Sequence, residues 1–397
     1  MADLAMMLLK DGYDAIPRLR QRTGTTRDDA FTCRVLGRRA VVVRGRDAVR
    51  LFYDEDVVQR EGAVPPPLAA LLFGRGAVHG TDGDQHRIRK AMFLGLLTSE
   101  RVDDLAATIG RDLARRVEGW PGREVSVFDE LVEVYGAAVQ AWAGIDQAPA
   151  DVHRTSRRLA TVVDGFGGAG TAYARAWAAR LQLDRWARDL VGRARRDPGS
   201  VRDDTVLADI ARGPGSGLDP HLAGVELLNV LRPTVAVAWP GTFLARDLAG
   251  LADHSTLGDE ARRSLGHEVR RTAPFVPALA GLVRRDTSFD GVALAPGDLL
   301  VLDVPGTNAH PDLWNEPERF APGRFVGHEP DPFGYVPQGG GYPATGHRCP
   351  GEPLTVRILQ QTADVLAGVP YHVVGSSDHD RRRIPTLPRH GLRVRVG

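Results

Sequence analysis

A glycine-rich loop over residues 338–352 delivers a single cysteine, Cys349, to the start of a helix. Pro350 suits the first helical turn, and apolar residues at helical spacing follow it. Backbone N–H groups at a helix start stabilise negative charge, and glycines let the backbone approach a flat ligand closely. The residues alone leave three roles open for the Cys349 sulfur: a metal ligand, a nucleophile or a small core side chain.

The bulk composition is that of a soluble globular protein, with 397 residues, 43% of them apolar and 25% charged. A net charge of +1 gives no reason to expect nucleic-acid binding. The two cysteines, Cys33 and Cys349, are far apart and indicate no disulfide framework, so we expect a cytoplasmic protein. The apolar stretch at residues 6–9 is short and lacks a basic segment before it, and no apolar run is long enough for stable membrane insertion.

The order of hydrophobic patterns predicts a single domain over residues 1–397, mainly α with a small β part. Residues 31–43 alternate around Gly37 and predict a β-hairpin. The longest helix is expected at about 220–249, and short strands at 279–304, 371–374 and 392–396. Further helices are expected near 85–97, 99–118, 126–143, 152–164, 170–196 and 203–212.

The longest predicted helix carries Arg232 and Pro233 within an apolar run. Pro233 removes a helix hydrogen bond and disfavours helical geometry before it, so we expect the helix to distort at Arg232. A buried arginine is costly unless it is paired. It either pairs with a carboxylate of the chain, such as Glu226, or accepts a substrate carboxylate in two parallel hydrogen bonds.

The sequence Q-G-G-G followed by G-H-R-C-P-G-E resembles the haem-thiolate loop of the cytochrome P-450 superfamily, and more closely that of its bacterial fatty-acid peroxygenase branch. As in that branch, Tyr342, Thr345 and His347 stand where Phe, Gly and Arg are common in the superfamily. The resemblance runs over nearly the whole chain and implies the cytochrome P-450 fold. It makes Cys349 the proximal ligand of the iron in a haem b cofactor.

The resemblance also implies catalytic roles for three residues. Oxygen-using members of the superfamily usually carry an acid followed by threonine where this chain has Arg232 and Pro233. In the peroxygenase branch this Arg-Pro pair holds the fatty-acid carboxylate, which supplies the missing acid–base group. His79 stands where that branch has Gln or His, and could donate a proton or orient the carboxylate. Without the resemblance, a lone loop histidine is more often a surface or packing residue.

Several further side chains are candidates for cofactor or substrate contacts. His86, Arg89 and Lys90 share one helix face, which on its own reads as a solvated basic face. The resemblance places His86 and Lys90 at the haem propionates, with Arg60 as a further candidate and His347 near the same propionates. Apolar residues are core by default, but three are expected to line an acyl-chain tunnel: Phe73, Phe166 and Ala236.

Glu268 and Arg271 are three residues apart, and Arg319 follows before the cysteine loop. Taken alone, a Glu-x-x-Arg pair is usually a surface ion pair. In this order it looks like the structural ion network of the superfamily. We therefore assign it to folding and to support of the cysteine loop.

The resemblance implies an oxidoreductase: a haem-thiolate peroxygenase that uses hydrogen peroxide to hydroxylate long-chain fatty acids at the α or β carbon, or to decarboxylate them to terminal alkenes. Its partners would be the fatty acid and hydrogen peroxide, with no obligatory reductase. One alternative is a redox-partner-dependent cytochrome P-450 monooxygenase acting on another carboxylic acid, which the Arg232-Pro233 replacement argues against. The other is a non-catalytic haem-binding protein, which His79 and Arg232 beside a full thiolate loop argue against.

Overall fold

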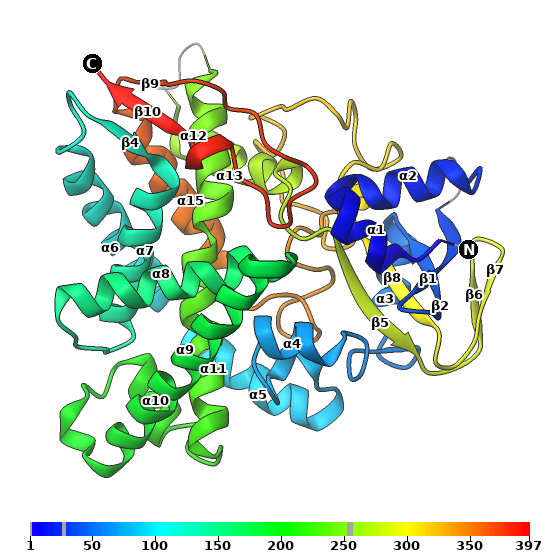
Figure 1. Cartoon of the computed structure of the whole chain (residues 1–397), viewed down its shortest axis with the longest axis horizontal. Helices are drawn as coiled ribbons and strands as arrows, with labels where there is room; N and C mark the ends of the chain where they lie inside the picture. The colour runs from blue at the N-terminus through cyan, green and yellow to red at the C-terminus, as the bar shows by residue number, and fades with distance from the viewer. Residues whose placement is uncertain (1, 26–28, 252–256) are drawn as a thin grey trace.

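The fold divides into a large helical region and a smaller region built on a β-sheet, as Figure 1 shows in a computed structural model of the chain. The structure describes residues 2–25, 29–251 and 257–397. The prediction of a mainly α fold with a small β part is confirmed.

The helical region carries the longer helices of the described residues, and most of them pack around α11 and α7. The α-helices are α1 (Leu4–Asp11), α2 (Ala15–Arg22), α3 (Arg46–Phe52), α4 (Pro66–Leu72), α5 (Gly83–Leu96), α6 (Ser99–Val117), α7 (Val127–Trp142), α8 (Pro149–Gly165), α9 (Gly170–Arg196), α10 (Val206–Arg212), α11 (Pro220–Ala236), α12 (Ala238–Ala249), α13 (Asp259–Thr272), α14 (Val304–Asn308) and α15 (Glu352–Ala367). A short 3-10 helix, η2 (Val78–Gly80), lies between α4 and α5.

The main sheet has five strands in the order β1-β2-β8-β5-β3. The predicted hairpin is confirmed: β1 pairs antiparallel with β2, and Cys33 lies opposite Ala40. A second sheet has the order β4-β10-β9, and β6 pairs with β7. The strands are β1 (Ala30–Val35), β2 (Arg38–Val43), β3 (Val58–Gln59), β4 (Glu124–Ser126), β5 (Ala278–Val283), β6 (Thr287–Phe289), β7 (Val292–Leu294), β8 (Leu299–Asp303), β9 (Tyr371–Val373) and β10 (Arg393–Val396).

The predicted helix at 220–249 is present as two consecutive helices, α11 and α12. Asp219 caps α11 by accepting from two backbone N–H groups, and Pro220 follows at the first helical position. The helix continues through Arg232 and Pro233, so the predicted distortion at Arg232 is wrong, and the break lies at Val237. There the N–H of Val237 bonds the carbonyl of Thr234 at 3.2 Å, the tighter three-residue spacing of a 3-10 turn.

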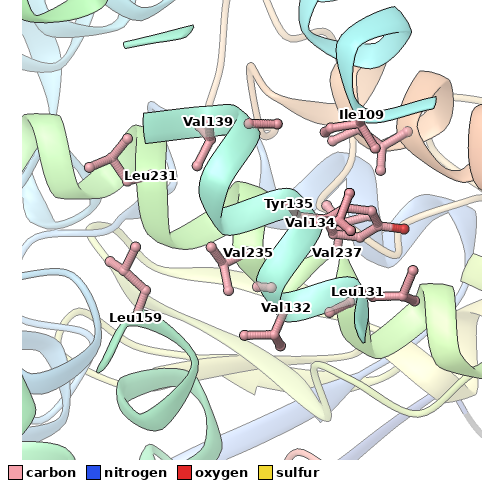
Figure 2. Packing of buried hydrophobic residues seen from close by; sticks show 14 of the residues in the cluster. Ile109, Leu131, Val132, Val134, Tyr135, Val139, Leu159, Leu231, Val235 and Val237 are labelled. Carbon is pink, nitrogen blue, oxygen red and sulfur yellow. The ribbon is translucent and has the colours of Figure 1, made fainter. Parts of the chain in front are cut away.

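Apolar side chains bury α11 and α12 in the centre of the helical region. Leu231 and Val235 of α11 lie near Val132 and Val139 of α7 (Figure 2), and all four are fully buried. The expectation that no apolar run is long enough to cross a membrane is wrong for one stretch of the described residues, Pro220–Ala249, which passes by length and composition. However, 89% of its apolar window is buried inside the protein. It is therefore the core helix of the fold.

The contact between α9 and α11 provides a test of this packing. A Cβ at Gly224 would lie 2.7 Å from the backbone N of Arg188, whereas a Cβ at Gly95, also helical, meets nothing within 4 Å. Gly224→Ala is expected to force the helices apart and lower the free energy of unfolding by about 1–3 kcal/mol. Gly95→Ala is expected to raise it by up to about 1 kcal/mol through helix propensity. Urea unfolding followed by circular dichroism measures both, and an unchanged stability for Gly224→Ala would contradict the close approach.

Candidate active site

The cysteine loop, residues 338–352, is held tightly against α3 and enters α15 directly. A Cβ at Gly340 would lie 2.3 Å from Cγ1 of Val49, so only glycine fits this approach. The N–H of Cys349 donates to the carbonyl of Gln338 at 3.1 Å, which closes the loop. The Gln338 side-chain amide also donates to the Cys349 sulfur at 3.7 Å. This contact could not be predicted from the sequence, because Gln338 is eleven residues away from Cys349 along the chain.

A buried ion network lies behind the loop. The guanidinium of Arg270 donates to Gln338 Oε1 at 2.8 Å and also pairs with the Glu352 carboxylate. Arg348 pairs with the other oxygen of Glu352 at 2.5 Å. Burial raises the pKa of the Cys349 thiol, while the Gly351 N–H, Lys90 and Arg270 act in the opposite direction. The network therefore both positions Cys349 and partly compensates a negative charge on it.

Glu268 and Arg271 form a buried ion pair, in line with the structural network that the resemblance implied and unlike the surface pair that the motif alone suggests. Arg319 is not a member of it through its side chain. Arg271 donates twice to the fully buried Glu268, at 2.8 Å and 2.8 Å. The third side chain is Arg324, which lies 3.1 Å from Glu268. Arg319 pairs instead with Glu316 and contributes only its carbonyl, which accepts from Arg271 at 3.2 Å. Arg319 is exposed, so its guanidinium remains in water and a nearer arginine fills the buried position.

Arg232 projects from α11 over the ring of Phe73, which stacks on His79. Arg232 is buried, with 7% of its surface exposed. One terminal nitrogen of its guanidinium donates to Asn229 Oδ1 at 3.3 Å, whereas its Nε has no hydrogen-bond partner. The guanidinium carbon lies 5.8 Å from the centre of the Phe73 ring. Burial and the charge of Arg180 lower the pKa of Arg232 to about 9, so it remains a cation at neutral pH.

The direct ion pair between Arg232 and Glu226 that the sequence left open is not formed. Glu226 pairs instead with Arg89 of α5 at 3.2 Å. Asn229 lies between the two residues: its amide donates to Glu226 at 3.0 Å and its oxygen accepts from Arg232. Asn229 stands three residues before Arg232 on the same helix face, a spacing that could have identified it.

His79, in η2, stacks on Phe73 with ring centroids 4.2 Å apart and planes 13° apart. By surface area His79 is exposed, although many protein atoms surround its ring. Desolvation and the nearby charge of Arg232 therefore lower the pKa of His79 to about 3. At neutral pH this imidazole is uncharged and offers one donor and one acceptor.

The four predicted propionate contacts gather around the same cysteine. The rings of His86 and His347 stack with centroids 3.8 Å apart. Lys90 donates to the carbonyls of Gly346, at 2.7 Å, and of Arg348, so its ammonium also supports the cysteine loop. One guanidinium nitrogen of Arg60 donates to a backbone carbonyl at 2.8 Å, whereas its Nη1 is buried without a partner.

These donors suit an iron cofactor that carries carboxylates. The thiol of Cys349 can ligate iron, and Arg60, Lys90, His86 and His347 offer N–H groups to acidic substituents. Lys90 donates to the carbonyl of Arg348, the residue next to Cys349, so its ammonium lies beside the cysteine. The buried, unpartnered Nη1 of Arg60 is a donor for which a carboxylate would be a strong partner.

The three predicted tunnel residues occupy different positions. Phe73 contacts both Arg232 and His79, as described. Ala236 is the last residue of α11, one turn after Arg232, and is 7% exposed. Phe166 ends α8 and is partly buried. Only Phe73 is therefore joined to the arginine site by a described contact, and the tunnel itself stays a prediction.

Comparison with known proteins defines the class of this site. A cytochrome P450 family model matches residues 265–361, from α13 to α15. A solved point mutant of cytochrome P450SP alpha (CYP152B1) is 35% identical, covers 100% of this chain and 98% of its own, and superposes with a TM-score of 0.92. A point mutant of cytochrome P450 OleT in complex with arachidonic acid is 30% identical, with coverages of 99% and 96% and a TM-score of 0.91.

Wild-type cytochrome P450EX alpha (CYP152N1) with myristic acid is 31% identical, with coverages of 99% and 96% and a TM-score of 0.91. A more distant relative, cytochrome P450 138 of Mycobacterium tuberculosis, is 26% identical over 339 residues, which are 79% of this chain and 76% of that protein. The fold and the site define a haem oxidoreductase. The chain belongs to the cytochrome P450 family, and its likeness to the peroxygenase branch of that family is confirmed.

The buried histidine behind the cysteine loop predicts a pH dependence of stability. Burial and the charge of Arg270 lower the pKa of His267 from 6.5 to about 3. As the pH falls below 6.5, the unfolded chain binds a proton at this residue that the folded protein does not, so stability is lost. Between pH 7 and pH 5 this loss is about 2 kcal/mol.

His267→Asn keeps an acceptor for Arg270 but cannot titrate, so its unfolding free energy should change less between the two pH values. Urea unfolding at pH 7 and pH 5 measures the difference. The exposed His372 offers the matched control, because His372→Asn is expected to keep the wild-type pH dependence. An identical pH dependence in all three proteins would contradict the assignment.

Proposed function

We propose that this protein is a peroxygenase that uses hydrogen peroxide to oxidise long-chain fatty acids beside their carboxyl group. The observation that carries this proposal is the buried guanidinium of Arg232, whose Nε has no partner and which lies over the Phe73 ring on which His79 stacks. A carboxylate is the complementary partner for such a group, since it accepts two parallel hydrogen bonds. The fatty acids bound by two of the solved relatives support the choice of substrate.

Cys349 would ligate the haem iron, and Arg60, Lys90, His86 and His347 would hold the propionates. Bound haem supplies the redox chemistry: activation of peroxide and oxidation of a neighbouring C–H bond. The whole chain, residues 1–397, would act as one cytoplasmic haem domain without an obligatory reductase. The solved relatives cover nearly all of this chain and of their own, which supports one unit.

The residues of the distal side supply binding and proton transfer. Arg232 would bind the fatty-acid carboxylate, and Pro233 would fix the helix geometry at that point. The bound carboxylate would take a proton from peroxide and return it, in place of the acid that oxygen-using relatives carry. His79, neutral at pH 7, would orient the carboxylate. Because the carboxylate is anchored, only the α and β carbons reach the oxidant.

The atoms balance for both outcomes. One fatty acid and one hydrogen peroxide give a hydroxy acid and one water. One fatty acid and one hydrogen peroxide also give a terminal alkene, carbon dioxide and two waters.

Product analysis tests the activity directly. The haem-loaded protein is incubated with myristic acid and hydrogen peroxide, without reductase or nicotinamide, and products are identified by mass spectrometry. We expect α- or β-hydroxymyristic acid, a terminal alkene, or a mixture. No product with intact haem, together with turnover once a ferredoxin and its reductase are added, would favour the partner-dependent monooxygenase instead.

Arg232→Ala tests the anchor. Turnover of myristic acid should fall at least a hundredfold with haem retained, because the carboxylate loses a charge-assisted bidentate contact. Added acetate should then restore peroxide-driven oxidation of a neutral substrate such as styrene, since acetate fits the vacated space and supplies the proton relay. Arg101→Ala, which breaks an ion pair with Asp209 on α10, is the matched control and should leave turnover unchanged. Full turnover of myristic acid by Arg232→Ala would exclude the role.

A further inference from the structure

Glu226 is a fully buried carboxylate on which hydrogen-bond donors from three elements converge. Its Oε1 accepts from the N–H of Val78 in η2 at 3.0 Å and from Arg89 of α5 at 3.2 Å. Its Oε2 accepts from the Asn229 amide of α11 at 3.0 Å. Glu226 therefore ties together the segment that carries His79, the helix that carries His86 and Lys90, and the helix that carries Arg232.

Glu226 also fixes which way the Asn229 amide points. An amide can present either its oxygen or its NH₂ group, and a carboxylate only accepts. Because Glu226 accepts from the NH₂ group, the oxygen of Asn229 is left for Arg232, at 3.3 Å. Nη2 of Arg232 is thereby used by Asn229, whereas its Nε has no partner.

We propose that Glu226 is a positioning residue: through Asn229 and Val78 it holds Arg232 and His79 in one fixed arrangement that receives the substrate carboxylate. This inference rests on the proposed function for the substrate, but the geometry it describes exists without substrate. Arg89 completes the arrangement by neutralising the buried carboxylate, and its second contact, to the carbonyl of Gly76, binds it to the same segment as His79.

Glu226→Gln is the sharpest test, because it keeps the shape and removes the acceptor-only character. The NH₂ group of the new glutamine must face one of the present donors. If it faces Val78 and Arg89, these two lose their acceptor. If it faces Asn229, the Asn229 amide turns and its NH₂ group points towards Arg232. The affinity for myristic acid, measured by spectral titration of the haem-loaded protein, is expected to fall about tenfold. Imidazole, which binds haem iron without a carboxylate anchor, should bind as to the wild type.

A double-mutant cycle separates positioning from general damage. If Glu226 acts through Asn229, the loss in Glu226→Gln combined with Asn229→Leu should be clearly smaller than the sum of the two single losses. Asp209→Asn removes an ion pair of α6 and α10 and is the matched control, with unchanged affinity expected. Additive losses, or a Glu226→Gln protein with wild-type affinity, would overturn the proposal.

Substrate-free hydrogen exchange keeps this test independent of the proposed function. The Val78 amide should exchange at least tenfold faster in haem-loaded Glu226→Leu, which leaves the Val78 N–H without its acceptor whichever way Asn229 points, than in the wild type or in Asp209→Asn. If the wild type neither binds nor oxidises fatty acids but this exchange is faster, the proposed function fails and the arrangement around Glu226 stands. An unchanged exchange rate of the Val78 amide would contradict the arrangement around Glu226. Should Glu226→Gln or Glu226→Leu not load haem, Glu226→Asp, which withdraws the carboxylate by one methylene, is measured instead, with the same direction expected.

Discussion

The structure depends on the cost of removing arginine from water. A buried guanidinium needs acceptors around it, and the fold supplies them at three points near the cysteine. Arg271 donates to Glu268, and Arg270 donates to Gln338 and pairs with Glu352. The contacts of Arg270 join α13 to the loop that precedes α15. The third, Arg232, receives only the Asn229 oxygen, so its environment remains incomplete within the chain.

That imbalance explains the division of labour in the site. On the side of Gln338 and Arg270, one Nη of Arg270 donates to Gln338 and to the Glu352 carboxylate although its Nε has no partner, and the Gln338 amide in turn donates to the Cys349 sulfur. On the side of Arg232, a cation and a neutral imidazole lie beside an aromatic ring with unused hydrogen-bonding capacity. A site of this kind binds a carboxylate strongly because the protein itself does not satisfy the arginine.

Much of this could be predicted from the sequence, for definable reasons. The hairpin around Gly37, the helices and the Cys349 loop follow local patterns, and the Glu268–Arg271 pair lies within one helical turn. Contacts between distant segments could not be predicted. Nothing in the sequence shows that Arg324 rather than Arg319 pairs with Glu268. Nor does it show that Glu226 pairs with Arg89 rather than with Arg232. The sequence placed a distortion at Arg232, whereas the helix continues through Pro233 and breaks at Val237, within a segment buried by its neighbours.

The sheet topology has a consequence for how the protein matures. Strand β2 pairs in parallel with β8, so residues 40–43 cannot form these hydrogen bonds until residues 299–302 have been synthesised. The site itself draws on segments from Arg60 to Glu352. During synthesis the ribosome must therefore release most of the chain before a cofactor-binding surface exists, and an unpaired hydrophobic hairpin stays exposed in the meantime. A complete cofactor site therefore requires a chain that already extends to Glu352.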